Sequence, residues 1–406
     1  MNYGRELMKM NKKTVRDVDA GGKRVLVRVD FNVPMQDGQI TDDTRIRAVL
    51  PTTNYLREAG ALVILCAHLG RPKGQIVPEH SLAPVAARLS ELLDDEAAFV
   101  DDCLGKQVTE AVEAAQPGDV ILLENTRFYP GETSKDKQEM LAFAEKLAAP
   151  AQMYVNDAFG ASHRKHGSTF GVTKFLSPCV AGLLVEEELT KLQRIVDAEH
   201  DGFVTVLGGA KVEDKIGVVK QLLPRVENLL IGGAMAWAFF KAQGMEVGES
   251  LCSDESVAGA RDILATMSDC LDNMALPVDV HMKNVKTGET RYAPADGIEP
   301  GWDALDIGPQ TREKYAEIVR SAQVVFWNGP MGYFEQPPFD DGTLAVARAM
   351  GQCPGYNVVG GGDSVAAITQ MGLADEMDHV STGGGASLEF IENNGSLPAV
   401  AALDDK

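Results

Sequence analysis

The 406-residue chain lacks any long apolar run. A membrane-spanning helix needs about 18 consecutive apolar residues, whereas the longest runs are about as long as ALVILCA (61–67), which has the length of one strand. The first residues, MNYGRELMKMNKK, contain no apolar core of a secretory signal peptide. The six cysteines are scattered without CxxC spacing, which favours buried thiols in a reducing compartment. We therefore predict a cytoplasmic protein that does not enter a membrane.

Positive charge is also scarce. Lysine and arginine total 38 against 59 aspartate and glutamate residues, and the net charge of −21 disfavours binding to nucleic acid or to an anionic membrane. The shortage of positive charge is uneven along the chain, because residues 1–100 contain 14 Lys and Arg against 13 Asp and Glu. A local anion site in this region would explain the difference, although chance is the simpler explanation of the charge count alone.

Several familiar catalytic patterns are missing. No GxxxxGK[ST] loop is present, and no early strand ends in GxGxxG, which argues against a P-loop enzyme and a Rossmann-type dehydrogenase. The early half also has no HRD-type loop, no GxSxG motif and no defensible Ser/His/Asp set. HRKH at 163–166 has no third ligand at zinc spacing. These absences favour a reaction that needs positioned charges but no general base.

Apolar strand candidates recur along the whole chain and alternate with Ala/Leu/Glu-rich helical stretches such as 136–149. They span residues 24–30, 61–68, 119–125, 152–159, 203–209, 228–233, 323–329, 356–362 and 379–385. Near-continuous apolar strands of this kind form parallel sheets that are buried on both faces. Because the chain is too long for one core, we predict an α/β protein of two domains. A helix predicted at 183–196 would connect them, although an ordinary surface helix would show the same pattern.

The predicted strand ends carry two different kinds of residue. Those of the early half carry polar and basic side chains, namely Asp30, Asn32, His68, Arg71, Arg127 and Arg164. Those of the late half carry four glycine clusters together with Lys211, Asn328 and Asp363. Ligands of open parallel sheets bind beyond the carboxyl ends of the strands. The division predicts two anionic substrates, one held by a cationic clamp and one by a backbone-lined phosphate site.

Two stretches in the late half indicate phosphate binding. In VLGGAKVEDKIG (206–217) a helix is predicted after Glu213, with Lys211 and Lys215 on one face of its first turn. Two cations repel each other there, and the positive end of the helix dipole disfavours both, so an anion is needed. In GGGDS (360–364) the glycines suit a phosphate and Asp363 suits Mg²⁺. A tight turn capped by Asp363 or Ser364 is the alternative.

Ten motifs together resemble one family. They are VRVDFNVP (27–34), TRI (44–46), HLGRP (68–72), LLENxRF (122–128), NDAFGxxHR (156–164), LGGAKVEDKI (207–216), DIGPQT (306–311), WNGPMGxFE (327–335), GGGDS (360–364) and STGGGASLEF (381–390). From about Val15 to its C-terminus, the chain resembles the phosphoglycerate kinases. The resemblance implies two Rossmann-like domains, each a parallel sheet flanked by helices, joined by a connecting helix. Residues 1–180 would bind phosphoglycerate, with 395–406 returning to that domain, and residues 181–394 would bind the nucleotide.

The resemblance also implies a reaction. A phosphoryl group would move reversibly from 1,3-bisphosphoglycerate to ADP, with Mg²⁺, giving 3-phosphoglycerate and ATP in glycolysis and gluconeogenesis. The enzyme would be a cytoplasmic monomer whose domains close about a hinge, binding these small molecules and neither nucleic acid nor membrane. A carboxylate acceptor is already ionised at neutral pH, which explains the missing base.

The implied site residues fall into three sets. The phosphoglycerate set is Asp30, Asn32, Arg45, His68, Arg71, Arg127, His163 and Arg164. The nucleotide set is Gly208, Gly209, Lys211, Lys215, Asn328, Glu335, Gly361, Gly362, Asp363 and Ser364, with Mg²⁺ on Asp363. The catalytic set is Arg45, Lys211, Gly384 and Gly385, whose cationic and backbone N–H groups would stabilise the transferring phosphoryl group.

One alternative is a non-catalytic phosphometabolite-binding protein of the same fold. Such a copy would lose charged site residues first, yet Arg45, Lys211 and Asp363 are present. The chain departs from the family pattern at Ser364, where threonine is usual, and at Tyr333, which is bulkier than the expected valine and leaves the nearby nucleotide contacts open. The first ten residues match no family motif and are expected to form a flexible extension.

Overall fold

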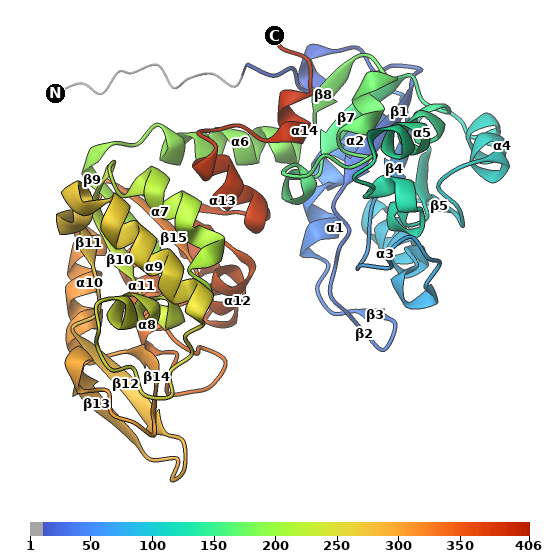
Figure 1. Ribbon diagram of the computed structural model, residues 1–406. Helices are drawn as coiled ribbons and strands as arrows, with labels where there is room; N and C mark the ends of the chain where they lie inside the picture. The colour runs from blue at the N-terminus through green and yellow to red at the C-terminus, as the bar shows by residue number, and fades with distance from the viewer. Residues whose placement is uncertain (1–10) are drawn as a thin grey trace. The chain divides into compact units, whose positions relative to one another are not determined.

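The computed structural model describes residues 11–406, so the predicted N-terminal extension lies outside the described residues. The chain divides into two compact units: unit 1 comprises Met1–Thr190 and Ser396–Lys406, and unit 2 comprises Lys191–Gly395. Helix α6 (Leu183–Val196) runs from unit 1 into unit 2 (Figure 1). Each unit contains a parallel sheet flanked by helices, which confirms the predicted fold class. Between residues 11 and 406, no helix combines the length and apolar character needed to cross a bilayer.

Unit 1 is built on a six-stranded parallel sheet in the order β5-β6-β4-β1-β7-β8. Its strands are β1 (Arg24–Val29), β4 (Leu62–Cys66), β5 (Ala97–Val100), β6 (Val120–Leu123), β7 (Met153–Asp157) and β8 (Cys179–Ala181). Its helices before α6 are α1 (Thr44–Ala48), α2 (Leu50–Glu58), α3 (Ala83–Leu93), α4 (Lys106–Ala114) and α5 (Lys137–Ala148). A short antiparallel hairpin of β2 (Met35–Gln36) and β3 (Gln39–Ile40) follows β1.

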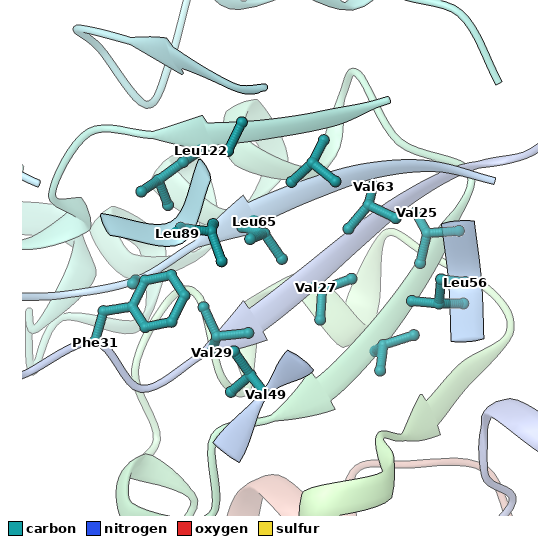
Figure 2. Close-up of a cluster of buried hydrophobic side chains, with 14 of the residues drawn as sticks. Val25, Val27, Val29, Phe31, Val49, Leu56, Val63, Leu65, Leu89 and Leu122 are labelled. Carbon is teal, nitrogen blue, oxygen red and sulfur yellow. The ribbon is translucent and has the colours of Figure 1, made fainter. Parts of the chain in front are cut away.

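Alternate residues of β1 enter one buried cluster. Val25, Val27 and Val29 pack there with side chains of β4 and β6 and with Leu56 of α2 (Figure 2). Burying one such side chain stabilises the fold by roughly 1.5–3 kcal/mol. Because successive strand residues point to opposite faces, Arg28 lies on the other face of the sheet from its two valine neighbours. The alternation of apolar residues along β1 therefore also determines on which face of the sheet the buried Arg28 side chain lies.

Unit 2 contains a second six-stranded parallel sheet in the order β11-β10-β9-β15-β16-β17. Its strands are β9 (His200–Leu207), β10 (Val226–Ile231), β11 (Met274–Ala275), β15 (Val324–Asn328), β16 (Tyr356–Gly360) and β17 (His379–Val380). Its helices are α7 (Ile216–Leu222), α8 (Gly233–Ala242), α9 (Asp254–Thr266), α10 (Pro309–Ser321), α11 (Asp341–Gly351), α12 (Gly362–Gln370) and α13 (Gly385–Glu392). An antiparallel sheet in the order β13 (Thr290–Pro294), β12 (Asp279–Asn284) and β14 (Trp302–Ile307) is added to it.

The last eleven residues of the chain, Ser396–Lys406, belong to unit 1. They include α14 (Pro398–Ala401). The Ala399 amide donates to the Ser162 carbonyl oxygen at 3.1 Å, and the Lys12 ammonium lies 2.8 Å from an Asp405 carboxylate oxygen. Unit 1 is therefore formed from both ends of the described chain.

Candidate active site

The predicted phosphoglycerate set lies at one edge of the unit 1 sheet. Asp30 follows β1, His68 follows β4, Arg127 follows β6 and His163 follows β7. These four strands are neighbours in the order β6-β4-β1-β7, and all are parallel. Their carboxyl ends therefore meet at the same edge, which is where open parallel sheets bind ligands.

Asp30, Asn32 and Arg45 form a connected group. Arg45 Nη1, from α1, donates to Asp30 Oδ2 and to the Asn32 carbonyl oxygen, each at 3.2 Å. Asn32 Oδ1 accepts a hydrogen bond from the Gly70 amide at 2.8 Å, which ties the loop after β1 to the loop after β4. Burial disfavours the charged carboxylate of Asp30, but the nearby Arg45 and Arg28 charges outweigh it and lower the pKa of Asp30. Asp30 is thus an ionised carboxylate that orients Arg45.

Sequence reasoning missed one candidate, Arg28. Its side chain is fully buried, and Arg28 Nη2 lies 2.9 Å from His68 Nδ1. Burial and the Arg28 charge hold the pKa of His68 well below its usual value, so the ring is neutral. A signal was available in the sequence, because an arginine inside the apolar strand RVLVRV is a charge that needs buried partners.

Three members of the set, Arg71, Arg127 and Arg164, line a pocket of about 1240 Å³ within unit 1. The wall also includes cations that the sequence analysis did not single out, namely Lys73, Lys135, Lys137, Lys165 and Lys174. The described residues that line this pocket include no carboxylate, although the chain as a whole has a net charge of −21. A concave wall of one charge sign concentrates ions of the opposite sign, so this pocket attracts anions.

Arg127 keeps its charge near neutral pH, whereas His163 beside Arg164 is neutral. Arg127 Nη1 donates to the Gly70 carbonyl oxygen at 2.8 Å, while its buried Nε has no hydrogen-bond partner among residues 11–406. Burial and the nearby Arg28 lower the pKa of Arg127 to about 10, which leaves it charged. Arg164 Nε donates to His163 Nε2 at 2.8 Å, and burial together with Arg164 lowers the pKa of His163 to about 4. The arginines therefore supply charge, and this histidine supplies a neutral ring.

The glycine clusters of the late half meet at one edge of the unit 2 sheet. Gly208 follows β9, Gly329 follows β15 and Gly361 follows β16, and these three strands are neighbours. The Gly208 amide donates to the Asn328 carbonyl oxygen at 3.0 Å. A Cβ on Gly329 would lie 2.2 Å from the Gly208 carbonyl oxygen, so the two loops pass too closely for a side chain. Glycine is therefore required where these backbones converge.

Asn328 has an unused donor at this edge. It is only 3% exposed, and its Nδ2 has no hydrogen-bond partner in the described part of the chain. A Cβ at Gly361, whose φ is +94°, would lie 2.6 Å from that nitrogen. Ser364, by contrast, is fully buried, and its hydroxyl accepts a hydrogen bond from the Gly329 amide at 2.5 Å. Asn328 can therefore donate to a ligand, whereas the Ser364 side chain holds a loop in place.

Lys211 and Lys215 do not share a helix face. Glu213–Lys215 form a 3₁₀ turn and α7 begins only at Ile216, so the prediction that both lysines lie on the first turn of one helix is wrong. Like-charge repulsion and the helix dipole both disfavour the predicted arrangement. Lys211 is exposed, and Lys215 is half-buried, with Nζ 3.5 Å from where a Cβ of Gly209 would lie. Both lysines instead belong to the loop that follows β9.

Asp363 is an exposed carboxylate in the first turn of α12. Burial lowers the pKa of Lys215, although the nearby Asp363 favours the charged form of that lysine. Within residues 11–406, no group of three or more His, Cys, Asp or Glu side chains is arranged to hold a metal ion. Mg²⁺ commonly binds one or two carboxylates and completes its shell with phosphates and waters. A single accessible Asp363 beside glycine-rich loops fits an ion of that kind.

The N-terminus of α13 is open. Gly384 precedes the helix with φ +52°, and Gly385 is its first residue. A Cβ added to either glycine, or to Gly362 at the start of α12, would meet no atom within 4 Å. The backbone here has room for a ligand to approach.

Glu335 and Tyr333 lie in the segment after β15. Glu335 is exposed, and Tyr333 is 49% exposed. Their large exposed fractions show that neither side chain is used in the core of unit 2, so both are available to a ligand.

The two predicted substrate sets divide cleanly between the units. Every member of the phosphoglycerate set lies in unit 1, and every member of the nucleotide set lies in unit 2. The catalytic set is split, because Arg45 belongs to unit 1 whereas Lys211, Gly384 and Gly385 belong to unit 2.

Comparison with known proteins agrees with this architecture. The family model described as phosphoglycerate kinase matches residues 15–394. The chain is 36% identical to phosphoglycerate kinase from Coxiella burnetii, with a TM-score of 0.84, covering 96% of this chain and 98% of that one. It is 35% identical to phosphoglycerate kinase from Pyrococcus horikoshii OT3, with a TM-score of 0.83 and the same coverage. The chain therefore belongs to the phosphoglycerate kinase family, whose members are phosphotransferases.

Proposed function

We propose that this protein catalyses the reversible, Mg²⁺-dependent transfer of a phosphoryl group from 1,3-bisphosphoglycerate to ADP, giving 3-phosphoglycerate and ATP. Such an enzyme acts in glycolysis and gluconeogenesis in the cytoplasm. The observation that carries the proposal is the division of the site. A cationic pocket whose described lining residues include no carboxylate lies in unit 1, and glycine-lined loops with an exposed Asp363 lie in unit 2. One side suits a small phosphorylated acid, and the other suits a nucleotide with its metal.

The unit 1 set would bind phosphoglycerate by charge. Arg71, Arg127 and Arg164 would hold its phosphate, since a guanidinium offers two parallel donors to phosphate oxygens. Arg45 would bind near the acyl end, where its contact with Asp30 fixes its orientation. Asp30 and Asn32 order the loops around the substrate and provide acceptors for its hydroxyl group.

The unit 2 set would bind the nucleotide through its phosphates. Backbone amides at the starts of α12 and α13 suit negative oxygens, because helix N-termini carry unpaired N–H groups and the positive end of the dipole. Lys211 and Lys215 would neutralise phosphate charge, and Asn328 Nδ2 would donate one further hydrogen bond. Asp363 would hold Mg²⁺, which when bound neutralises charge on the nucleotide phosphates.

Catalysis would then rest on alignment and charge. The 3-phosphoglycerate carboxylate is already ionised at neutral pH, so no residue has to remove a proton from the nucleophile. Arg45 and Lys211 would stabilise charge on the transferring phosphoryl oxygens, with amides near Gly384 and Gly385. Because the substrates bind to different units, the units must close on each other around the two bound substrates. Closure about the chain between them would also exclude water from the acyl phosphate.

A coupled assay tests the proposal directly. Purified protein with 1,3-bisphosphoglycerate, ADP and Mg²⁺ should form ATP, and omission of Mg²⁺ should abolish the reaction. A protein that binds both substrates by calorimetry yet forms no ATP would instead be the non-catalytic phosphometabolite-binding protein. Size-exclusion chromatography with light scattering should give the mass of a monomer.

A further inference from the structure

A chain of buried hydrogen bonds connects His68 through Arg28 and Ser168 to Glu132, and the proposed mechanism assigns no role to it. The side chain of Arg28 is fully buried in β1, and its Nη2 lies 2.9 Å from His68 Nδ1. Its Nη1 donates to the Val29 carbonyl oxygen. Burying a guanidinium is costly unless all of its donors and its charge are matched, so such an arrangement is retained only with several buried partners.

The contact with Arg28 determines which ring nitrogen of His68 carries the proton. A guanidinium has five N–H donors and no acceptor, so in this contact Arg28 donates and His68 Nδ1 accepts. An accepting Nδ1 carries no proton, and a neutral imidazole then carries its proton on Nε2. The titratable groups that face the ring are Arg28, Asp30, Arg127 and His166, of which His166 is neutral because burial lowers its pKa to about 3. Burial and the Arg28 charge keep the ring neutral, and Asp30, with Oδ1 4.0 Å from Nδ1, is the only one of them that opposes this.

Arg28 is held in turn by two further buried residues. Arg28 Nε donates to Ser168 Oγ at 2.8 Å. The Ser168 hydroxyl, whose oxygen accepts that bond, donates to Glu132 Oε1 at 2.6 Å. The Ser168 amide donates to Glu132 Oε2 at 2.8 Å. Both Glu132 oxygens therefore act as acceptors, as in an ionised carboxylate. Burial raises the pKa of Glu132, whereas the Arg28 charge and the two Ser168 hydrogen bonds favour its ionised form, in which it offsets the charge of buried Arg28.

The backbone is shaped to bring Glu132 and Ser168 together. The Gly167 amide donates to the Glu132 carbonyl oxygen at 2.9 Å. A Cβ on Gly167 would lie 2.5 Å from Phe143 Cδ1 and 3.2 Å from Glu132 Oε2, so a side chain there would separate the pair. The chain of contacts therefore depends on packing as well as on hydrogen bonds.

We propose that Glu132 and Ser168 are positioning residues that, through Arg28, hold His68 in the tautomer with its proton on Nε2. In that state the ring nitrogen left for a ligand is a neutral donor, which suits a carboxylate or phosphate oxygen of the substrate. A neutral donor can bind and release this oxyanion without gaining or losing a proton itself. The statement about substrate rests on the proposed function, whereas the statement about the tautomer does not.

Nitrogen-15 NMR of the histidine rings in the free, uniformly labelled protein tests the tautomer. The His68 signals are identified by their loss in His68→Gln. In the wild-type protein we expect a pyridine-type signal from His68 Nδ1 and a pyrrole-type signal from Nε2. A pyrrole-type Nδ1, or an imidazolium at pH 7, would overturn the proposal whatever the protein catalyses. Because the tautomer is read from the unaltered chain and only the assignment uses His68→Gln, this test does not require any variant of Glu132 or Ser168 to fold.

Variants test the roles of the two positioning residues. In Glu132→Gln and in the milder Ser168→Ala, His68 should lose its single tautomer and show averaged ring signals. The matched control is Glu124→Gln, because buried Glu124 also accepts from a serine hydroxyl at 2.6 Å and from an amide at 2.8 Å, but bonds to Ser81 and Leu82 instead. This control should keep the wild-type His68 signals. Unchanged signals in both test variants would refute the roles of Glu132 and Ser168.

Steady-state kinetics test whether the His68 tautomer affects binding of the substrate. In Ser168→Ala the KM for 3-phosphoglycerate should rise about tenfold, which is the effect of weakening one hydrogen bond to a charged group, while the KM for ATP stays unchanged. Equal changes in both values would indicate general loss of structure and contradict a role toward this substrate. If the wild-type protein had no kinase activity, the proposed function would fail, yet the NMR result would still decide the tautomer.

Discussion

At the scale of single residues, Lys211 is the side chain on which the proposed chemistry depends most. It is exposed in the loop after β9, and no ion pair in the described part of the chain engages it. Lys211→Ala should lower kcat far more than it weakens substrate binding, because a charge aimed at the transferring group acts mainly in the transition state. By analogy with loss of an oxyanion-hole donor, we expect about 2.7–4 kcal/mol, or a hundred- to thousandfold.

Steady-state kinetics decide this prediction. Lys220→Ala is the control, because this lysine also lies near the start of unit 2 but pairs with Asp262 at 2.5 Å on α9. The control should keep its turnover. A loss in kcat of less than about tenfold for Lys211→Ala, or 1.4 kcal/mol, would remove Lys211 from the catalytic set.

Arg127 should act on one substrate only. It lines the unit 1 pocket, and its Nη1 is fixed by the Gly70 carbonyl oxygen. Arg127→Ala should weaken binding of 3-phosphoglycerate by about tenfold or more, since a hydrogen bond to a charged group contributes about 1.5–3 kcal/mol. Calorimetric titration with 3-phosphoglycerate and with MgADP separates the two ligands. Lys106→Ala, an exposed lysine paired with Glu110 on α4, is the charge-matched control. Equal losses for both ligands would contradict the assignment of one substrate to each unit.

At the scale of elements, the loops after β9 and β15 constrain each other. Gly329 has φ +94°, and a Cβ there would lie 2.2 Å from the Gly208 carbonyl oxygen. Gly329→Ala should therefore disrupt both loops and abolish measurable MgADP binding. The matched control is Gly244→Ala in the same unit, where φ is +85° but a Cβ would meet no atom within 4 Å. That control suffers only the left-handed strain of about 1–2 kcal/mol. Similar nucleotide affinity in the two variants would show that the close approach is not required.

A buried carboxylate from β7 contacts the start of α6. Asp157, the last residue of β7, is fully buried, and its Oδ1 accepts from the Leu184 amide at 3.0 Å. Its Oδ2 has no hydrogen-bond partner within residues 11–406. Burial raises the pKa of Asp157 from 3.8 to about 7. The folded state thus binds this proton more tightly than the unfolded state does.

This shift predicts how stability depends on pH. Below about pH 4 the carboxyl group is protonated in both states and has no effect. As pH rises from about 4 to 7, the unfolded state loses the proton first, so stability falls, and above about 7 the full penalty of a buried charge remains. Urea denaturation midpoints at pH 5 and pH 8 test this. Asp157→Asn, which cannot ionise, should lose less stability between these pH values than the wild type. An identical loss in both proteins would show that Asp157 is ionised at pH 5 as well.

At the scale of the whole molecule, the site residues that could be predicted from the sequence differ from the others in how the fold brings them together. Asp30, His68 and Arg127 were predictable because they directly follow apolar strands, and parallel strands bring their carboxyl ends to one edge. The hydrogen bond from Arg28 to Ser168 was not predictable, because it joins residues that are 140 positions apart in the sequence. No spacing rule connects two such positions, and only the packed sheet brings them together.

The lysines of the unit 1 pocket show a second limit. Lys135 and Lys165 lie in polar stretches, and Lys174 lies in the short segment FGVTKFL (170–176); none shows periodicity, so each lysine alone has the pattern of a surface charge. Their common location depends on how the loops after β6 and β7 pack. The wrong placement of Lys211 and Lys215 on one helix face has the same origin, because the sequence pattern does not show where the helix begins.

The last prediction concerns both units together. Each predicted substrate set lies wholly within one unit, whereas reacting atoms must come within about 3–3.5 Å of each other for phosphoryl transfer. Bound substrates must therefore be brought together, and exposed ion pairs, worth about 0–1 kcal/mol each, are too weak to do this alone. We expect the radius of gyration from X-ray scattering to fall only when 3-phosphoglycerate and MgADP, a pair that cannot react, are both bound. Arg127→Ala, at the same ligand concentrations, should show a smaller decrease because less 3-phosphoglycerate is bound. If calorimetry shows both ligands bound to the wild type while the scattering stays that of the free protein, the reaction does not proceed through domain closure.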